Sequence, residues 1–376
     1  MDERKVHRFA TMDGLRGVAA IGVMLYHYTY RRHGGGLSGG PFAVDVFFCL
    51  SGFVIAFAYG ERLDGGLGFA AFARARLTRL YPMYALGLLL GLVNYAAGGA
   101  VNAPGLVALA FVSGALMLPT FAPFAIGFGA ESTNAVLFPF NPPAWSLSDE
   151  LLCNALFAFF RPRGWRLAAT LAVALAAFIA TGWLAGAPAG WGRDNWWAGP
   201  PRALFSFYAG VALCDLWRAG RLDFPLKAPW LPLAAVAIAM FCPTRPAWFL
   251  PLAVLLGPAS VALAIEAPAS AATRRVFERL GALSYPLYAI HVPALGLMRL
   301  GYNALTGAPA EAVPPMAVHL GFAGAVIAFS LWLAARIDAP ARRWLQKLSR
   351  DASPSVALTR RGASQRSDSV RPPPKR

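Results

Sequence analysis

Apolar runs of about 20 residues recur along almost the whole chain, and they restrict its fold more than any other feature. A run of that length crosses the hydrocarbon core of a bilayer as an α-helix. Within the bilayer only helices and closed barrels satisfy every backbone polar group. Barrel strands alternate apolar and polar residues, and these runs do not. The sequence therefore predicts an all-α fold, a polytopic bundle of transmembrane helices.

The composition supports a membrane protein over a soluble one. Hydrophobic residues make up 57% of the 376 residues, charged residues make up 14%, and the mean hydropathy is +0.50. Soluble domains contain roughly 45–50% apolar and about 25% charged residues. The four cysteines lie in apolar segments without paired ligand spacing, so we interpret them as core residues and expect no metal site.

Eleven segments are candidate spans, and the charges of the loops between them suggest an orientation. The segments are 12–30, 42–59, 80–97, 106–122, 143–160, 167–185, 201–216, 229–243, 247–266, 281–300 and 315–336. Arginine and lysine concentrate near the N-terminus, in the C-terminal tail and in the loops 60–79, 161–166, 217–228 and 267–279. Basic loops mark the cytoplasmic side, so both termini are expected in the cytoplasm of a cell (inner) membrane protein.

The same loop charges reduce the expected number of spans to about ten. Residues 79 and 161 both belong to basic loops, so an even number of crossings must separate them, yet three candidate segments lie between. The stretch 106–141 is interrupted by prolines and glycines, which suits a broken or re-entrant segment lining a cavity. Arg31 and Arg32 run against this scheme, because they fall on the outer side.

Half of the formal net charge of +16 lies at the C-terminal end. The residues from Arg336 to Arg376 include eleven Lys or Arg and three Asp or Glu, which gives a net charge of +8. We interpret 1–336 as the membrane-embedded domain and 337–376 as a disordered basic cytoplasmic tail that faces membrane lipid. Nucleic acid is therefore not expected as a partner.

Charged residues within the first two spans are the first candidates for chemistry. At about 100° per residue, Arg16 and His27 lie on one helix face, roughly 16 Å apart, and are expected to line one cavity. Asp45 is expected to pair with a histidine or arginine of the first helix. Paired with His27, it would orient the imidazole as a general base. The alternatives are an anchoring arginine, a structural histidine and a structural ion pair.

Three further groups of residues stand out. Arg76 and Arg79 share a helix face at the cytoplasmic mouth, where guanidinium groups bind phosphates or simply anchor the helix. Trp145 pairs with Asp149, and Ser146 with Glu150, at helical i, i+4 spacing. The last candidates are Tyr285 and His291, which place a hydroxyl and a second imidazole inside one span.

The residue blocks 12–27, 44–53, 76–82, 145–150 and 283–291, in this order, resemble the integral membrane acyltransferase 3 family over about 10–300. The resemblance implies O-acylation, with acyl-CoA as donor, of polysaccharides, lipopolysaccharide, peptidoglycan, antibiotics or lipid-linked sugars. It also implies that Arg16, His27, Arg76 and Arg79 are needed for activity. The block at 145–150 keeps Glu150 of the family's usual glutamate pair and has Leu151 in place of the second. Many family members carry a fused esterase-like domain. We expect none here, so the acceptor would be acylated directly or through a separate extracytoplasmic partner.

We therefore expect an enzyme that moves an acyl group, expected to be acetyl, from cytoplasmic acyl-CoA to a hydroxyl of a cell-surface or lipid-linked carbohydrate. Arg16, Arg76 and Arg79 would hold the donor, and the catalytic residues would be His27, Asp45 and Glu150. His27 would act as a base or as a transient acyl carrier, and the sequence leaves both open. A proton-coupled secondary transporter is the alternative, because it also needs charged residues inside the membrane, but no internal symmetry supports it.

Overall fold

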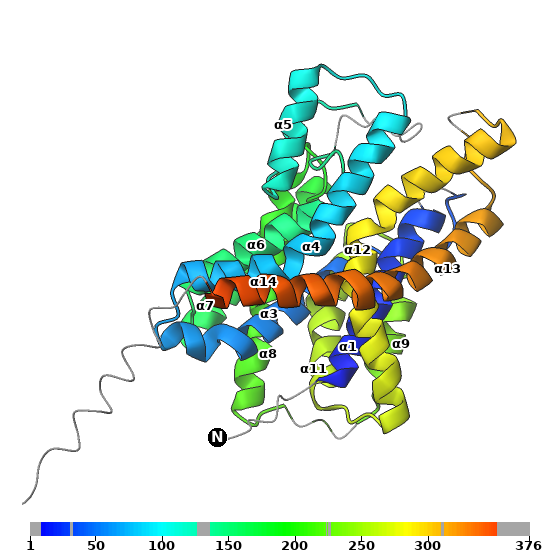
Figure 1. The fold of residues 1–376 in the computed structure, drawn as a ribbon. Helices are drawn as coiled ribbons and strands as arrows, with labels where there is room; N and C mark the ends of the chain where they lie inside the picture. The colour runs from blue at the N-terminus through cyan, green and yellow to red at the C-terminus, as the bar shows by residue number, and fades with distance from the viewer. Residues whose placement is uncertain are drawn as a thin grey trace, which may run out of the picture.

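The computed structural model describes residues 9–30, 33–125, 136–222, 224, 227–309 and 312–351. Secondary structure in these residues is helical apart from an isolated β-bridge between Val136 and Gly192. The predicted all-α fold is thus confirmed (Figure 1). The elements are α1 (Ala10–Leu25), η1 (Tyr26–Tyr30), α3 (Phe42–Asp64), α4 (Phe69–Ala97), α5 (Pro104–Ala115), α6 (Ala144–Phe159), α7 (Trp165–Ala185), η3 (Trp196–Ala198), α8 (Gly199–Arg218), α9 (Leu231–Ala239), α10 (Pro246–Pro251), η4 (Leu252–Leu256), α11 (Gly257–Glu266), α12 (Ala271–Thr306), α13 (Met316–Leu333), η5 (Ala334–Asp338) and α14 (Ala339–Asp351).

Helices α3 and α12 form the centre of the bundle. Of their most apolar stretches, 67% of α3 and 72% of α12 is buried, against 22% for α7 and 28% for the segment that begins with α13. Helix α12 packs against α1, α4 and α13, and α3 packs against α8, α1 and α11 (Figure 1). The two central helices carry two of the five sequence blocks, and α1, α4 and α6, which carry the other three, each pack against at least one of them.

Small residues let the central helices approach closely. A Cβ atom added at Gly52 of α3 would overlap the carbonyl oxygen of Phe207, and one at Gly210 of α8 would overlap that of Cys49. Lipid tails are as apolar as the helices, so close van der Waals packing of this kind replaces the hydrophobic effect as the force between helices. The two glycines therefore fix the crossing of α3 and α8.

Among the described residues, six helical segments are long and apolar enough to cross a membrane, and the expected ten spans are not confirmed. These segments are Phe42–Asp64, Phe69–Ala97, Trp165–Ala185, Pro246–Ile265, Ala271–Thr306 and Met316–Leu348. The helices at the other expected spans are too short or carry too many charged residues to qualify as membrane spans. Helices α1 and α6 have 16 residues each and α9 has 9, and α8 carries Arg202, Asp215 and Arg218.

The stretch 106–141 is broken where the structure describes it. Helix α5 has only 12 residues, and irregular chain follows it from Leu116 to residue 125. A 12-residue helix is about 18 Å long, too short to cross a bilayer core of about 30 Å. The expectation that this stretch lines a cavity is wrong for the cavity described below, which has no residue from it. Residues 126–135 lie outside the described part.

The C-terminal region is helical further than the sequence suggested. Residues 337 and 338 complete η5 and residues 339–351 form α14, although disorder was expected from 337 onward. The buried carboxylate of Asp338 forms an ion pair with Arg342 at 2.7 Å, and α14 packs beside α4. Arg342 and Leu345 are half-buried, whereas Trp344 is 62% exposed. This amphipathic packing orders the helix, and the expected tail beyond 351 lies outside the described residues.

Candidate functional site

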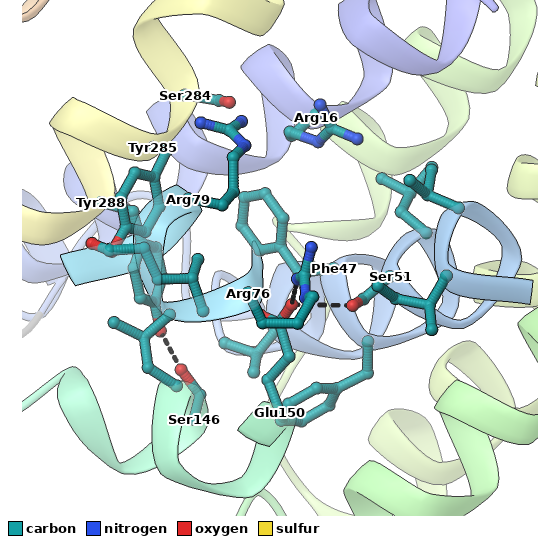
Figure 2. A pocket seen from close by; sticks show the side chains of 17 residues that line it. Arg16, Phe47, Ser51, Arg76, Arg79, Ser146, Glu150, Ser284, Tyr285 and Tyr288 are labelled. Atoms are coloured by element: carbon teal, nitrogen blue, oxygen red, sulfur yellow. Dashed lines mark hydrogen bonds and ion pairs between the residues drawn. The ribbon is translucent and has the colours of Figure 1, made fainter. Parts of the chain in front are cut away.

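A cavity of about 180 Å³ lies between α1, α3, α4, α6 and α12. Its wall contains three arginines, Arg16 from α1 and Arg76 and Arg79 from α4, and one carboxylate, Glu150 of α6 (Figure 2). The remaining lining residues are apolar or carry hydroxyls: Val44, Phe47, Phe48, Leu50, Ser51, Val54, Ile55, Leu80, Ser146, Leu147, Ser284, Tyr285 and Tyr288. With three guanidinium groups and one carboxylate, the lining side chains carry a net positive charge, which favours an anionic ligand.

Glu150 holds one of the three arginines through a single oxygen. Its Oε1 accepts a hydrogen bond from Arg76 at 3.0 Å and another from the Ser51 hydroxyl at 2.7 Å (Figure 2). The side chains of Arg76 and Glu150 are only 12% and 16% exposed. The Nε of Arg76 is buried and makes no hydrogen bond. Glu150 therefore leaves one N–H donor of Arg76 unused.

The other two arginines lie on the opposite side of the cavity from Glu150. Figure 2 shows both guanidinium groups in the upper part of the view, with Glu150 in the lower part. Arg79 lies 3.7 Å from the Asp338 carboxylate and 5.7 Å from the centre of the Tyr285 ring. Arg16 contacts Asp13 at 3.2 Å, one turn earlier in α1. Both arginines are partly exposed, at 24% and 34%, and are thus accessible to a ligand.

Helix α6 presents two different faces, as the i, i+4 pairs predicted. Ser146 and Glu150 line the cavity, and the Ser146 hydroxyl lies 2.6 Å from the Tyr288 hydroxyl. Trp145 turns away from the cavity and packs on the guanidinium of Arg202, 5.4 Å from its ring centre. Trp145 therefore packs behind the cavity wall. Neither Trp145 nor Asp149 is part of the lining.

His27 and His291 lie beyond Tyr288 and contact each other. His291 Nε2 is 3.3 Å from His27 Nδ1, and the Tyr288 and His291 rings are 5.7 Å apart. The expectation that Arg16 and His27 line one cavity is wrong, because the cavity ends before His27 is reached. The cationic cavity and the imidazole pair are thus neighbouring sites, and Tyr288 forms part of the boundary.

The hydrogen bonds of the two rings assign their tautomers. His291 Nδ1 lies 2.9 Å from the Tyr288 carbonyl oxygen, so it carries the proton and Nε2 holds the lone pair. His27 Nδ1 lies 2.9 Å from the Val23 carbonyl oxygen and faces that lone pair, so it also carries the proton. In the neutral ring the basic nitrogen of His27 is therefore Nε2. His27 lies in the π-helical turn η1, a distortion that is frequent at functional sites.

Asp45 pairs with Arg202 of α8, and the predicted pairing with His27 or another first-helix residue is wrong. Its two oxygens accept hydrogen bonds from Arg202 Nε at 2.8 Å and Nη2 at 2.7 Å. Arg202 also donates to the carbonyl oxygens of Pro41 and Ala189. Both charged side chains are at most 2% exposed. This geometry makes the pair a structural connection between α3, α8 and two loops.

Arg202 could have been found in the sequence. It is the single charged residue in the segment 201–214, and an ionisable residue inside a span needs a partner of opposite charge. Asp45 is the equally isolated carboxylate of the segment 42–60. Ser51 and Asp338, which hold Glu150 and Arg79, had no comparable signal. No group of three or more His, Cys, Asp or Glu side chains in the described ranges is arranged to hold a metal ion.

Comparison with known proteins identifies the family. The family model described as an acyltransferase domain, that of acyltransferase 3, matches residues 9–335. Protein 2 in the picA locus of Rhizobium radiobacter is 35% identical over 48% of this chain and 96% of its own length. Acyltransferase MdmB of Streptomyces mycarofaciens is 26% identical over 81% of this chain and 82% of its own. The exopolysaccharide production protein ExoZ of Rhizobium meliloti (strain 1021) is 27% identical over 76% of this chain and 86% of its own.

No solved structure matches the chain significantly. The family model covers most of the chain, and the helices that form the arginine cavity and the histidine pair all begin within its limits. The chain therefore belongs to the acyltransferase 3 family, and it is an acyltransferase that transfers groups other than aminoacyl groups.

Proposed function

We propose that this enzyme moves an acetyl group from cytoplasmic acetyl-CoA to a hydroxyl of a cell-surface or lipid-linked carbohydrate. The observation that carries the proposal is the cavity with three arginines and one carboxylate next to the His27–His291 pair. CoA carries three phosphates, and guanidinium groups bind phosphates with both charge and geometry. An imidazole with a basic Nε2 near the end of that cavity provides the proton acceptor that an attacking hydroxyl requires.

The relatives support a carbohydrate acceptor. One of them is named for exopolysaccharide production and another as an acyltransferase. Membership of an acyltransferase family also decides against the alternative of a proton-coupled transporter. The acceptor would reach His27 from the outer side, either directly or delivered by a separate extracytoplasmic partner, with membrane lipid surrounding the bundle.

In the proposed reaction, the arginines hold the donor phosphates and the thioester extends toward His27. His27 Nε2 takes the proton of the acceptor hydroxyl while the hydroxyl oxygen attacks the carbonyl carbon of the thioester. The C–S bond then breaks, and the CoA sulfur leaves with the proton from Nε2. His291 Nε2 accepts a hydrogen bond from His27 Nδ1, which stabilises the imidazolium as it forms. His291 thus takes the orienting role that Asp45 was expected to have. Transient acylation of His27 is the second route.

The double variant Arg76→Lys with Arg79→Lys tests donor binding directly. Lysine keeps both positive charges but lacks the forked donor geometry, so we expect the Kd for CoA to rise about tenfold or more. The measurement is CoA binding to the detergent-solubilised protein by calorimetry. Arg274→Lys with Arg275→Lys, at the exposed start of α12, makes the same change away from the cavity and should leave binding intact.

Two results would contradict the donor assignment. If wild-type protein binds neither CoA nor acetyl-CoA, the cavity has another ligand. If the double lysine variant binds CoA as tightly as wild type, Arg76 and Arg79 are helix anchors. Thermal unfolding of each variant in the same detergent shows whether a loss of binding comes from misfolding.

The orientation of the chain is a further part of the proposal. The basic loops and the six apolar helices support a multi-pass protein of the inner membrane with both termini in the cytoplasm. Reporter fusions after residues 163 and 350 should both give cytoplasmic signals. An external signal from either fusion would reverse the donor side and place the arginine cavity away from cytoplasmic CoA.

A further inference from the structure

Glu150 occupies the place in the cavity that suits a ligand phosphate. Its Oε1 accepts hydrogen bonds from Arg76 at 3.0 Å and from Ser51 at 2.7 Å, as an oxygen of a phosphate would. Arg16 and Arg79 have no bond to Glu150, and Figure 2 shows them across the cavity from it. Glu150 is thus the carboxylate that lies within the cavity lining itself. Arg16 and Arg79 pair with Asp13 and Asp338, which are not lining residues, and both guanidinium groups remain partly exposed.

We propose that Glu150 competes with the donor phosphate for Arg76 and so makes the cavity selective for ligands that carry more than one phosphate. This inference rests on the proposed use of the cavity for acyl-CoA. A ligand that replaces Glu150 at Arg76 must compensate for an ion pair and for the hydrogen bond to Ser51. A single phosphate gains only one new set of contacts, whereas a ligand with several phosphates also engages Arg16 and Arg79.

Three features of the site support displacement over a permanent ion pair. Arg76 Nε is buried without a hydrogen bond, so the carboxylate leaves Arg76 incompletely satisfied. Both bonds converge on Oε1, and Oε2 accepts none from the residues that the structure describes, so Glu150 is held less firmly than a bidentate carboxylate such as Asp45. The Glu150 side chain is also 16% exposed and lines the cavity, so it has space into which it can turn.

The variant Glu150→Gln tests this competition, because it removes the charge and keeps the shape. We expect the Kd for CoA to fall about tenfold, since a hydrogen bond to a charged group contributes roughly that factor. We also expect the Kd for inorganic phosphate, measured without CoA, to fall in the variant. Asp149→Asn is the matched control: it makes the same carboxyl-to-amide change one residue earlier in α6, on the face near Arg202, and should leave both values unchanged.

The opposite result has a clear meaning. If wild type binds CoA and Glu150→Gln binds it equally or more weakly, Glu150 positions Arg76 for the donor and does not compete with it. If wild type binds no CoA, the proposed function itself fails. Should Glu150→Gln not fold, Ser51→Ala provides the second measurement, because it weakens the hold on Glu150 without touching an arginine. It should lower the Kd for CoA by a smaller factor, and an unchanged or raised Kd would overturn the competition.

Discussion

Replacing His27 by alanine should lower the rate of acyl transfer by about 10²- to 10⁴-fold, the usual contribution of general acid–base catalysis. The structure places its Nδ1 against Val23 and His291, which leaves Nε2 as the basic atom of the ring. His27 is only half-buried and lies in η1, directly after α1, so its loss should not prevent insertion or folding. The measurement is O-acylation by purified protein in vesicles supplied with acyl-CoA.

His291→Ala is the comparison for this experiment. His291 would only stabilise the protonated form of His27, so replacing His291 should reduce the rate by a smaller factor than replacing His27. CoA binding should be unchanged in both variants, because neither histidine lines the arginine cavity. A His27→Ala protein that keeps near-wild-type activity would remove this residue from the mechanism, and an equal loss in both variants would show that the two imidazoles act as a unit.

Breaking the Asp45–Arg202 pair should produce the largest loss of stability in the protein. Removing one partner of a buried ion pair costs about 3–5 kcal/mol, because the other charge stays buried without compensation. The pair is bidentate, at most 2% exposed, and enclosed by the rings of Trp145 and Phe249. We therefore expect Asp45→Leu and Arg202→Met to lower the unfolding temperature strongly in detergent, with reduced yield of folded protein.

The double variant Asp45→Leu with Arg202→Met separates stability from catalysis. It removes both charges and replaces them with apolar side chains, which is often neutral or stabilising, so it should be more stable than either single variant. A structural pair predicts that the double variant also retains acyl transfer. A stable but inactive double variant would restore a catalytic role to Asp45, and single variants as stable as wild type would show that the pair contributes little.

Local patterns in the sequence determined much of the cavity. Arg76 and Arg79 lie three residues apart, and Ser146 and Glu150 lie four apart. Both members of each pair line the cavity, because spacing along a helix sets which side chains share a face. The apolar runs also predicted the all-α fold. In a bilayer each apolar segment must make all its backbone hydrogen bonds, and a helix makes them within that segment. Arg16 was also placed correctly in the cavity.

Only the tertiary structure decided which residues of different helices meet. Asp45 finds Arg202, 157 positions away, and His27 finds His291, 264 positions away. Spacing along one helix carries no information about such contacts, because they depend on the crossing of α3 with α8 and of α1 with α12. The same holds for Asp338, which joins Arg79 to α14 and orders residues that composition alone suggested were disordered. The sequence determined the faces of the helices, and packing between helices determined their partners.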